Sequence, residues 1–395
     1  MIRIALQMLV GGRAKYLSLV LGITVTAFLV TYAASFFCGM MTRSFAMIGE
    51  IPAADVWIMD PAIECVDQTI DMRAGSLGAV RSVNGVRWAV PLLLANAEVR
   101  FPDGRFLPVQ VIGVDDATLV GAPLLEGGQR ADLLRMPDAA IIADGGTIGK
   151  LETSITPIIP GGQPNMDGDR RPLAVGDELT LNDFHIRVVG TADATPRYPP
   201  RPLVYMTYSN ALRVLPIERR RLTFVLAAAG PGVEPGVLAD RIAARTGLRA
   251  RTSEDFKADT VWWFLMNSED VGDVETMLSI AMIVGLGVTG VMLFLFTQDN
   301  LRYYAVLKAM GCTPRWLVLM VLAQGGLCAL LGMGLGLGIC VASSSYSAWA
   351  GVPFRMMWFT PLVGGAAVLV VTAVAAAISV WPVIKLDPGA VFTFR

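Results

Sequence analysis

Two places in this sequence hold residue types that could do chemistry: a glycine-rich loop that ends in lysine, and a single histidine. The loop is Gly145-Gly146-Thr147-Ile148-Gly149-Lys150. A Walker A phosphate loop has a longer spacing between its glycines and a Ser or Thr after the lysine, which binds magnesium. Here Leu151 follows the lysine, so the sequence predicts no nucleotide site at this loop.

The histidine, His185, lies in a predicted strand without a cluster of Cys, Asp or Glu beside it. A lone histidine of this kind is more often structural than a metal ligand or a general base. Serine hydrolase and zincin patterns are absent from the sequence, and the five cysteines show neither zinc spacing nor a disulfide framework. The sequence therefore predicts a non-catalytic chain that binds no cofactor or metal of its own.

A different kind of function is indicated by the short polar segment 299–315, which lies between two long apolar runs. Gly311 is placed to end one helix, and Thr313-Pro314 is placed to begin the next. A basic excess beside membrane spans marks the cytoplasmic side, and Arg302, Lys308 and Arg315 outnumber Asp299 here. We name 299–315 the corner. From charge alone it could equally be a positive loop that only sets membrane topology.

The composition of the whole chain is that of a membrane protein. Of 395 residues, 54% are hydrophobic and only 16% are charged, whereas soluble proteins carry about 25% charged residues. A net charge of -1 gives no indication of a nucleic-acid partner. Long apolar runs predict four transmembrane helices, at 16–42, 274–298, 316–345 and 357–384, with an outer loop at 346–356.

The two ends of the chain fit the same topology. Residues 1–15 form a basic amphipathic segment that could lie along the inner membrane face, and 385–395 form a tail. A secretory signal peptide is the rival interpretation of the N-terminus, but the charge-free run 16–42 is too long for one. Four crossings return the C-terminus to the side of the N-terminus. We therefore expect a multi-pass protein of the bacterial inner membrane with both termini in the cytoplasm.

Between the first two spans, residues 43–273 have the composition of a soluble domain with mixed elements. A Pro-Asp-Gly turn at 102–104 predicts a hairpin over 99–106 that leads into a strand at 109–114. A second hairpin is predicted around Asn182-Asp183. Helices are predicted at 71–83 and 235–246, and a loop at 155–172. The fold class is thus an α+β membrane protein with four transmembrane helices and a large mixed α/β periplasmic domain inserted between helices 1 and 2.

The membrane spans themselves carry two further signals. None contains Asp, Glu, Lys, Arg or His, which argues against an ion-coupled carrier and suits helices that transmit movement. Small residues at four-residue spacing allow close helix packing. Such pairs occur as Gly332/Gly336 and Gly334/Gly338, and either intramolecular packing or a dimer seam would explain them. Before the second span, the aromatic residues at 262–264 favour an interfacial anchor over a substrate-binding surface.

The residues of the corner resemble a known family. Tyr304 to Gly311, YAVLKAMG, is similar to the cytoplasmic coupling segment of ABC-transporter membrane subunits of the MacB/FtsX type, closest to the stand-alone DevC branch. The phrases VNGV at 83–86, VIGVD at 111–115, VGD at 175–177 and VVG at 188–190 occur in the order found in MacB-type periplasmic domains. The terminal LDPGAVF at 386–392 resembles the end of DevC-branch proteins, with Gly389 in place of alanine.

The resemblance implies a non-catalytic permease subunit that relays the movement of a separate ABC ATPase to the periplasmic domain. ATP and Mg would bind on the partner ATPase dimer and not on this chain. Further implied partners are a second copy of this chain, a periplasmic adaptor (membrane fusion protein), an outer-membrane channel and membrane lipid. The family usually has Glu at the position of Tyr303, so an acidic contact there is not expected. Residues implied in ATPase docking are Tyr303, Tyr304, Leu307, Lys308, Met310 and Gly311.

Three alternatives have the same or a related topology. A lipoprotein-releasing subunit of the LolC/LolE kind has four spans and a similar length. An FtsX-like regulator of cell-wall hydrolases would signal without transport, although its outer domain is normally much shorter. A membrane receptor unrelated to ABC systems would have no reason for the Lys-Ala-Met-Gly corner. The substrate is not identifiable from the sequence.

Overall fold

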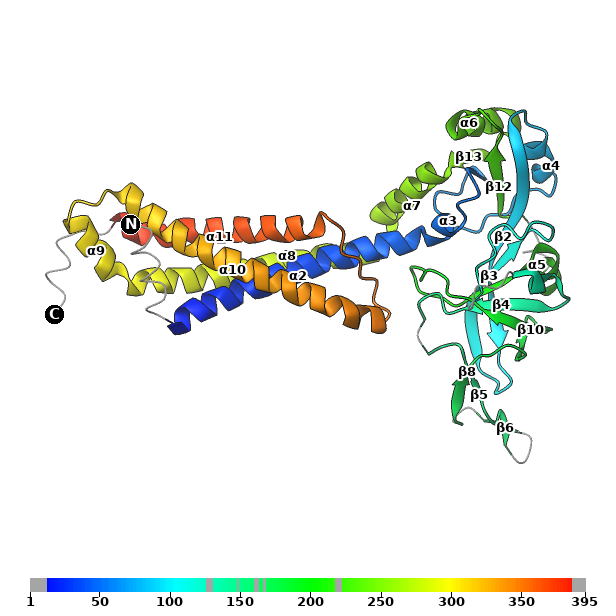
Figure 1. Cartoon of the computed structure of the whole chain (residues 1–395), viewed down its shortest axis with the longest axis horizontal. Coiled ribbons are helices and arrows are strands. Elements are labelled where there is room, and N and C mark those ends of the chain that lie inside the picture. The colour runs from blue at the N-terminus through cyan, green and yellow to red at the C-terminus, as the bar shows by residue number, and fades with distance from the viewer. Residues whose placement is uncertain are drawn as a thin grey trace. The chain divides into compact units, whose positions relative to one another are not determined.

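The computed structural model divides into two compact units, which are described separately. It describes residues 13–125, 131–147, 149–159, 163–165, 168–216 and 222–385. One unit, the membrane unit, combines Met1–Met40 with Glu269–Arg395, and the other, the inserted domain, is Met41–Ser268 (Figure 1). The predicted N-terminal segment and the C-terminal tail lie almost wholly outside the described residues.

Four helices of the membrane unit are long and apolar enough to cross a membrane. They are α2 (Arg13–Ser44), α8 (Glu269–Asp299), α10 (Pro314–Trp349) and α11 (Thr360–Lys385), with the short α9 (Leu301–Ala309) between α8 and α10. The four spans and the α/β domain inserted after the first of them confirm the predicted fold class.

Two helices extend beyond the predicted spans for identifiable reasons. α8 begins at Glu269, because acidic residues in a first turn interact favourably with the helix dipole. α10 continues past the serines at 343–345, where the sequence predicted its end. The Ser343 and Ser344 hydroxyls donate to the carbonyls of Cys340 and Val341, each at 2.7 Å, so these polar groups are satisfied inside the helix.

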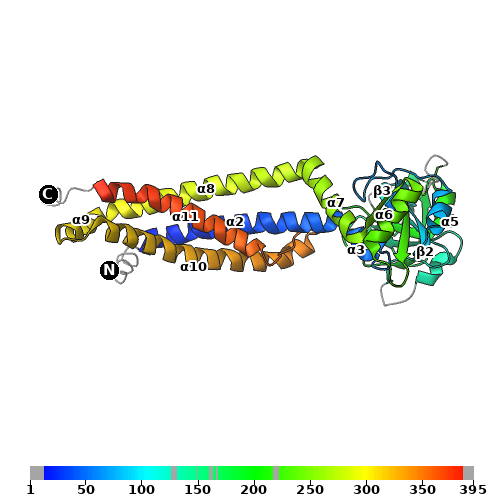
Figure 2. The same ribbon diagram turned by 90° about the horizontal axis from the view of Figure 1, so that it is seen from above.

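Helix α2 packs against the other three spanning helices through glycines. Figure 2 shows α2 running along α8, α10 and α11 in the membrane unit. A Cβ added at Gly336 of α10 would lie 2.6 Å from the Cβ of Ala27. At Gly285 of α8 it would lie 2.5 Å from Thr26, and at Gly364 of α11 it would meet the hydroxyl oxygen of Thr31. Because only a residue without a side chain fits at these contacts, the glycines let the helix backbones approach closely.

The inserted domain is built on a nine-stranded sheet in the order β13-β1-β12-β2-β3-β11-β4-β10-β9. An additional β2–β9 pairing closes the six strands from β2 to β9 into a ring. The strands are β1 (Val56–Met59), β2 (Val86–Arg100), β3 (Phe106–Val114), β4 (Ala139–Ala143), β9 (Glu178–Leu181), β10 (Phe184–Thr191), β11 (Leu203–Thr207), β12 (Phe224–Ala229) and β13 (Arg249–Thr252).

Helices cover both faces of this sheet next to β1. Alternate residues of a strand face opposite sides, and all four residues of β1 are buried. Val56 packs with Ile242 of α6 in one core, while Trp57 packs with Phe256 of α7 in another. The helices of this domain are α3 (Ala46–Glu50), α4 (Ser76–Arg81), α5 (Tyr208–Val214), α6 (Pro235–Thr246) and α7 (Ser253–Asn267), with a 3-10 turn η1 (Ala131–Arg135).

Both predicted hairpins and one predicted helix are confirmed. β2 and β3 pair from Arg100↔Phe106 to Leu92↔Val114 across the Pro-Asp-Gly turn. β9 and β10 pair around Asn182 and Asp183, whose φ angles of 46° and 68° fit a type I′ turn. The predicted helix 235–246 is α6, and it ends at Gly247 with φ of 70°.

Two local predictions differ from the structure, and one helix was not predicted. α4 is shorter than the predicted helix 71–83. The predicted loop 155–172 contains short paired strands, β6 (Ile158–Ile159) with β7 (Gln163–Pro164), and β8 (Arg170–Pro172), which pairs with β5 (Glu152–Ser154). The aromatic residues at 262–264 belong to helix α7, which sequence reasoning missed. Its signal was present, because Thr252 caps the helix by accepting from the backbone N–H of Asp255 at 3.1 Å.

Candidate functional site

The corner is a helical turn whose two ends are set by local backbone rules. α8 ends at Asp299 and α9 begins at Leu301. At the end of α9, the N–H of Cys312 donates to the carbonyl of Leu307 and the N–H of Gly311 donates to that of Lys308, each at 3.0 Å. This pair of bonds is a Schellman motif, and Gly311, with φ of 92°, occupies its left-handed position. The predicted helix stop is therefore confirmed.

The restart of the helix is also as predicted. Thr313 is the N-cap residue of α10 in extended conformation, and Pro314 follows at the first helical position. The Thr313 side chain makes no capping hydrogen bond, so the position is correct but the expected side-chain role is not seen. Figure 1 shows the short helix α9 between α8 and α10. The chain thus reverses direction within a few residues and places α9 beside the first turns of α10.

Tyr304 lies inside this turn. It is fully buried, and its hydroxyl donates to the side-chain oxygen Oε1 of Gln324 on α10 at 2.9 Å. Burial raises the pKa of Tyr304 to about 12, so the phenol stays protonated and can donate this bond at any physiological pH. Its ring packs in an apolar cluster with Leu317, Met320, Val321 and Val380, and Leu307 is partly buried against the same cluster.

Other predicted docking residues lie on the surface of the membrane unit. Tyr303 is 61% exposed and Met310 is 71% exposed, while Lys308 is partly buried. Val306, which the sequence analysis did not select, is also exposed. Residues three or four apart share a helix face, so Tyr303, Val306 and Met310 form one apolar face of α9 and its cap. We name these three residues the outer face of the corner. Tyr304 and Leu307 belong to the adjoining side, which packs against α10.

The glycines of the third span also divide into a buried pair and an exposed pair. Gly332 and Gly336 are buried against α2, where added side chains would meet Ile23 and Ala27. Gly334 and Gly338 are exposed and have nothing within 4 Å. Packing against α2 thus explains Gly332 and Gly336. For Gly334 and Gly338 the dimer seam stays a prediction.

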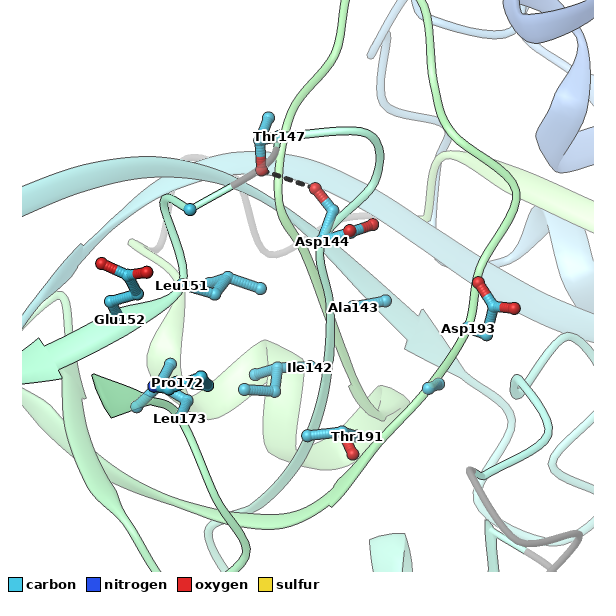
Figure 3. Close-up of a pocket in the computed structure, with 12 residues that line it drawn as sticks. Ile142, Ala143, Asp144, Thr147, Leu151, Glu152, Pro172, Leu173, Thr191 and Asp193 are labelled. Atoms are coloured by element: carbon cyan, nitrogen blue, oxygen red, sulfur yellow. Dashed lines mark hydrogen bonds between the residues drawn. The ribbon is translucent and has the colours of Figure 1, made fainter. Parts of the chain in front are cut away.

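The glycine-rich loop of the inserted domain borders a cavity of about 330 Å³ (Figure 3). Three carboxylate residues, Asp144, Glu152 and Asp193, line it together with apolar side chains. A cavity with this lining repels phosphate, because like charges would face each other without a compensating cation. The loop itself is held by its own contacts, since the Thr147 hydroxyl donates to the carbonyl of Asp144 at 2.6 Å. Ile148 lies outside the described residues.

His185 is exposed on β10, opposite Thr180 of β9. Within the described ranges, no group of three or more His, Cys, Asp or Glu residues is placed to hold a metal ion.

Sequence reasoning missed a polar cluster in the inserted domain around Glu50, the last residue of α3. One oxygen of Glu50 accepts from the backbone N–H of Thr195 at 2.6 Å, and the other accepts from Nη2 of Arg197 at 2.5 Å. Arg197 is almost fully buried and also contacts the hydroxyl of Tyr205 at 3.2 Å. Burial raises the pKa of Tyr205. No sequence signal pointed to this cluster, because its members are far apart in the chain.

Part of the membrane unit matches a known protein family. Residues 276–388, which include the corner, match the family described as FtsX-like permease C-terminal. A search of curated proteins found no match.

Three solved structures are similar to part of the chain. The periplasmic region of MacB from Actinobacillus actinomycetemcomitans is 11% identical, with a TM-score of 0.36, over 53% of this chain and 94% of that one. The extracellular domain of the noncanonic ABC-type transporter YknZ from Gram-positive bacteria is 11% identical, with a TM-score of 0.32, over 50% and 98%. A domain of a putative permease from Porphyromonas gingivalis is 14% identical, with a TM-score of 0.30, over 50% and 86%.

The family match covers the corner and the last three spanning helices. The inserted α/β domain after the first span is the other feature expected of a MacB/FtsX-type chain. Residues 276–388 are thus similar to FtsX-like permeases, and this match supports an ABC-transporter permease of the MacB/FtsX type as the class of this protein.

Proposed function

We propose that this chain is the membrane subunit of an ABC exporter and relays the ATP-driven motion of a separate ATPase subunit to its inserted domain. The corner carries the proposal. It is a rigid helical turn with an apolar outer face, inside a region that matches the permease family. The fixed Schellman cap holds that face in one orientation.

The outer face suits a protein partner better than water or lipid. Tyr303, Val306 and Met310 are large exposed apolar side chains in a segment that also carries the exposed cations Arg302 and Arg315. Exposed apolar residues rimmed by charge are typical of interaction sites. We place the ATPase here and ATP with Mg on that partner. The corner is on the cytoplasmic side in this proposal, and the inserted domain is periplasmic.

The finer assignments follow from the resemblance. Two copies of the chain would pair, with one ATPase subunit on each corner. The inserted domains would engage a periplasmic adaptor and an outer-membrane channel in a tripartite export system. Within this type we propose the DevC branch, on the resemblance of YAVLKAMG at 304–311.

The test is co-purification of an ATPase subunit in detergent with the native chain and with two variants. Met310→Asp places a charge in the outer face without touching the apolar cluster under it, and we expect loss of the ATPase from the purified complex. Met136→Asp is the matched control, because Met136 is an exposed methionine of the inserted domain. Equal recovery of the ATPase with both variants would contradict docking at the corner.

Sidedness has its own test. Cysteines at Met310 and at Val175 of the inserted domain would be labelled in intact cells with a membrane-impermeant maleimide, in a Cys312→Ser background. We expect labelling at 175 and protection at 310. Labelling of both positions from outside would overturn the proposed topology.

A further inference from the structure

The Tyr304–Gln324 hydrogen bond links the corner to the spanning helix α10 at a depth where polar groups are unusual. Gln324 is fully buried and follows Arg315, the first residue of the candidate span, by nine positions. At about 1.5 Å per residue, this places its amide roughly 13 Å along the helix from Arg315. A polar side chain at that depth is costly unless it is hydrogen-bonded, because no water is available there.

Tyr304 also links the outer face of the corner to the apolar cluster beneath it. Tyr304 lies on α9 one position from Tyr303 of the outer face, yet its ring is packed between α10 and α11 through Leu317, Val321 and Val380. A push on the outer face therefore acts on a helix whose inner side is anchored by the directional Tyr304–Gln324 bond and by apolar contacts. Apolar contacts tolerate sliding, whereas a hydrogen bond fixes distance and direction.

We propose that Tyr304 and Gln324 are positioning residues that make α9 and α10 move as one body when the ATPase acts on the corner. This inference rests on the proposed function and assigns Tyr304 to transmission instead of docking. The bond would hold α9 in register with α10, so displacement of the outer face reaches the membrane helix. Without the bond the ATPase would still dock, but its motion would be taken up by slippage between α9 and α10.

Three variants separate transmission from folding. Tyr304→Phe and Gln324→Leu each remove one partner, and the double variant removes both. Leaving one buried polar group without a partner destabilises a protein, whereas replacing both partners by apolar groups of similar shape is close to neutral. The bond can be lost only once, so the double variant should lose less thermal stability than the sum of the two single variants. If the bond transmits motion, the double variant should not regain coupling.

The experiment measures three quantities on the full chain purified with its ATPase. These are ATPase co-purification, the thermal midpoint, and the ATP-dependent shift in distance between spin labels on Met136→Cys of the paired inserted domains. The Cys312→Ser background avoids labelling of the partly exposed native cysteine. We expect normal co-purification for all three variants, a fall in the midpoint of the double variant that is smaller than the sum of the two single falls, and a loss of about 5-fold or more in the ATP-shifted population for all three.

Each possible outcome either supports or contradicts the inference. A double variant that keeps its full ATP response would show that the bond serves stability alone, and would overturn the inference. A full ATP response in either single variant would do the same. If the labelled chain with native Tyr304 and Gln324 shows no ATP response, the proposed function fails and the inference falls with it.

Discussion

The inserted domain and the membrane unit solve the same problem, a buried polar side chain, with different chemistry. In the inserted domain, the carboxylate of Glu50 is paired with the nearly buried guanidinium of Arg197. In the membrane unit, a neutral phenol and a neutral amide are paired, Tyr304 with Gln324. Charged pairs carry a large desolvation cost that rises with the depth of burial, whereas neutral pairs carry a smaller one. The inserted domain thus buries a charged pair and the membrane unit a neutral pair, and the neutral pair carries the smaller desolvation cost.

The two units also differ in how their interiors are packed. Apolar side chains such as Trp57, Phe224 and Phe256 fill the core of the inserted domain and contact each other through their rings. In the membrane unit, glycines remove side chains so that helices touch through their backbones. Lipid chains are as apolar as the helix surface, so the hydrophobic effect does not drive helices together in a membrane. Close van der Waals packing stabilises their association instead.

The largest effect is expected where a side chain is forced into a glycine contact. Gly336→Val would place its Cβ 2.7 Å from the backbone oxygen of Thr24, and we expect a loss of about 3 kcal/mol in stability. Gly334→Val is the matched control, because nothing lies within 4 Å of that position. Thermal denaturation in detergent measures both. If the control instead changes only the oligomeric state, the exposed glycines form the dimer seam; equal thermal midpoints would remove the distinction between the two faces.

Breaking the charged link of the inserted domain should have the next largest effect. Arg197→Met leaves the Glu50 carboxylate with Thr195 but without its cation, and we expect a loss of about 2 kcal/mol. Arg187→Met is the control, because its pair with Glu178 is exposed and should contribute less than about 1 kcal/mol. Chemical denaturation monitored by tryptophan fluorescence distinguishes them. Similar losses in both variants would mean that burial does not set the strength of these pairs.

A smaller effect is expected at the helix cap of the corner. Gly311→Ala forces a side chain into a left-handed conformation at φ of 92°, which costs about 1 kcal/mol even though the space around it is open. The orientation of the outer face depends on this cap, so ATPase co-purification should weaken together with the thermal midpoint. The control is Gly326→Ala, which lies inside α10 with nothing within 4 Å. A stable variant that binds the ATPase normally would show that the cap is dispensable.

The smallest effect concerns pH. The hydrogen bond from Arg171 lowers the pKa of Asp177 below its ordinary value, so the ionised form is favoured in the folded state. This stabilisation is present above the unfolded pKa of about 4 and is lost as pH falls through the lower folded pKa. Asp177→Asn should therefore flatten the decline of the thermal midpoint between roughly pH 5 and pH 3. An unchanged acid slope in this variant would exclude Asp177 as a contributor.

Much of the architecture could be predicted because it depends on local or compositional signals. Charge-free runs identified the four spans, and Gly311 with Thr313-Pro314 identified the corner. The Asn182-Asp183 turn identified a hairpin, because a positive φ at both positions suits few other residues. Helix α7 was missed because its aromatic residues were interpreted as a membrane anchor and its N-cap was overlooked.

The candidate site was predictable only in part. The segment was found from its sequence, but two neighbouring tyrosines in it face opposite ways. Tyr303 is exposed and Tyr304 is buried, and their side chains are chemically the same. Only the packing of α9 on α10 and α11 distinguishes them.

The sequence by itself determined the number of spans, the insertion of an α/β domain after the first of them, and the position of the corner. These features follow from runs of apolar residues and from single residues that start or stop helices, which act over a few positions of the chain. The tertiary structure alone decided which face of the corner is free, which glycines contact α2, and that Glu50 pairs with Arg197. Those choices depend on contacts between residues distant in sequence, whose energies no local pattern records.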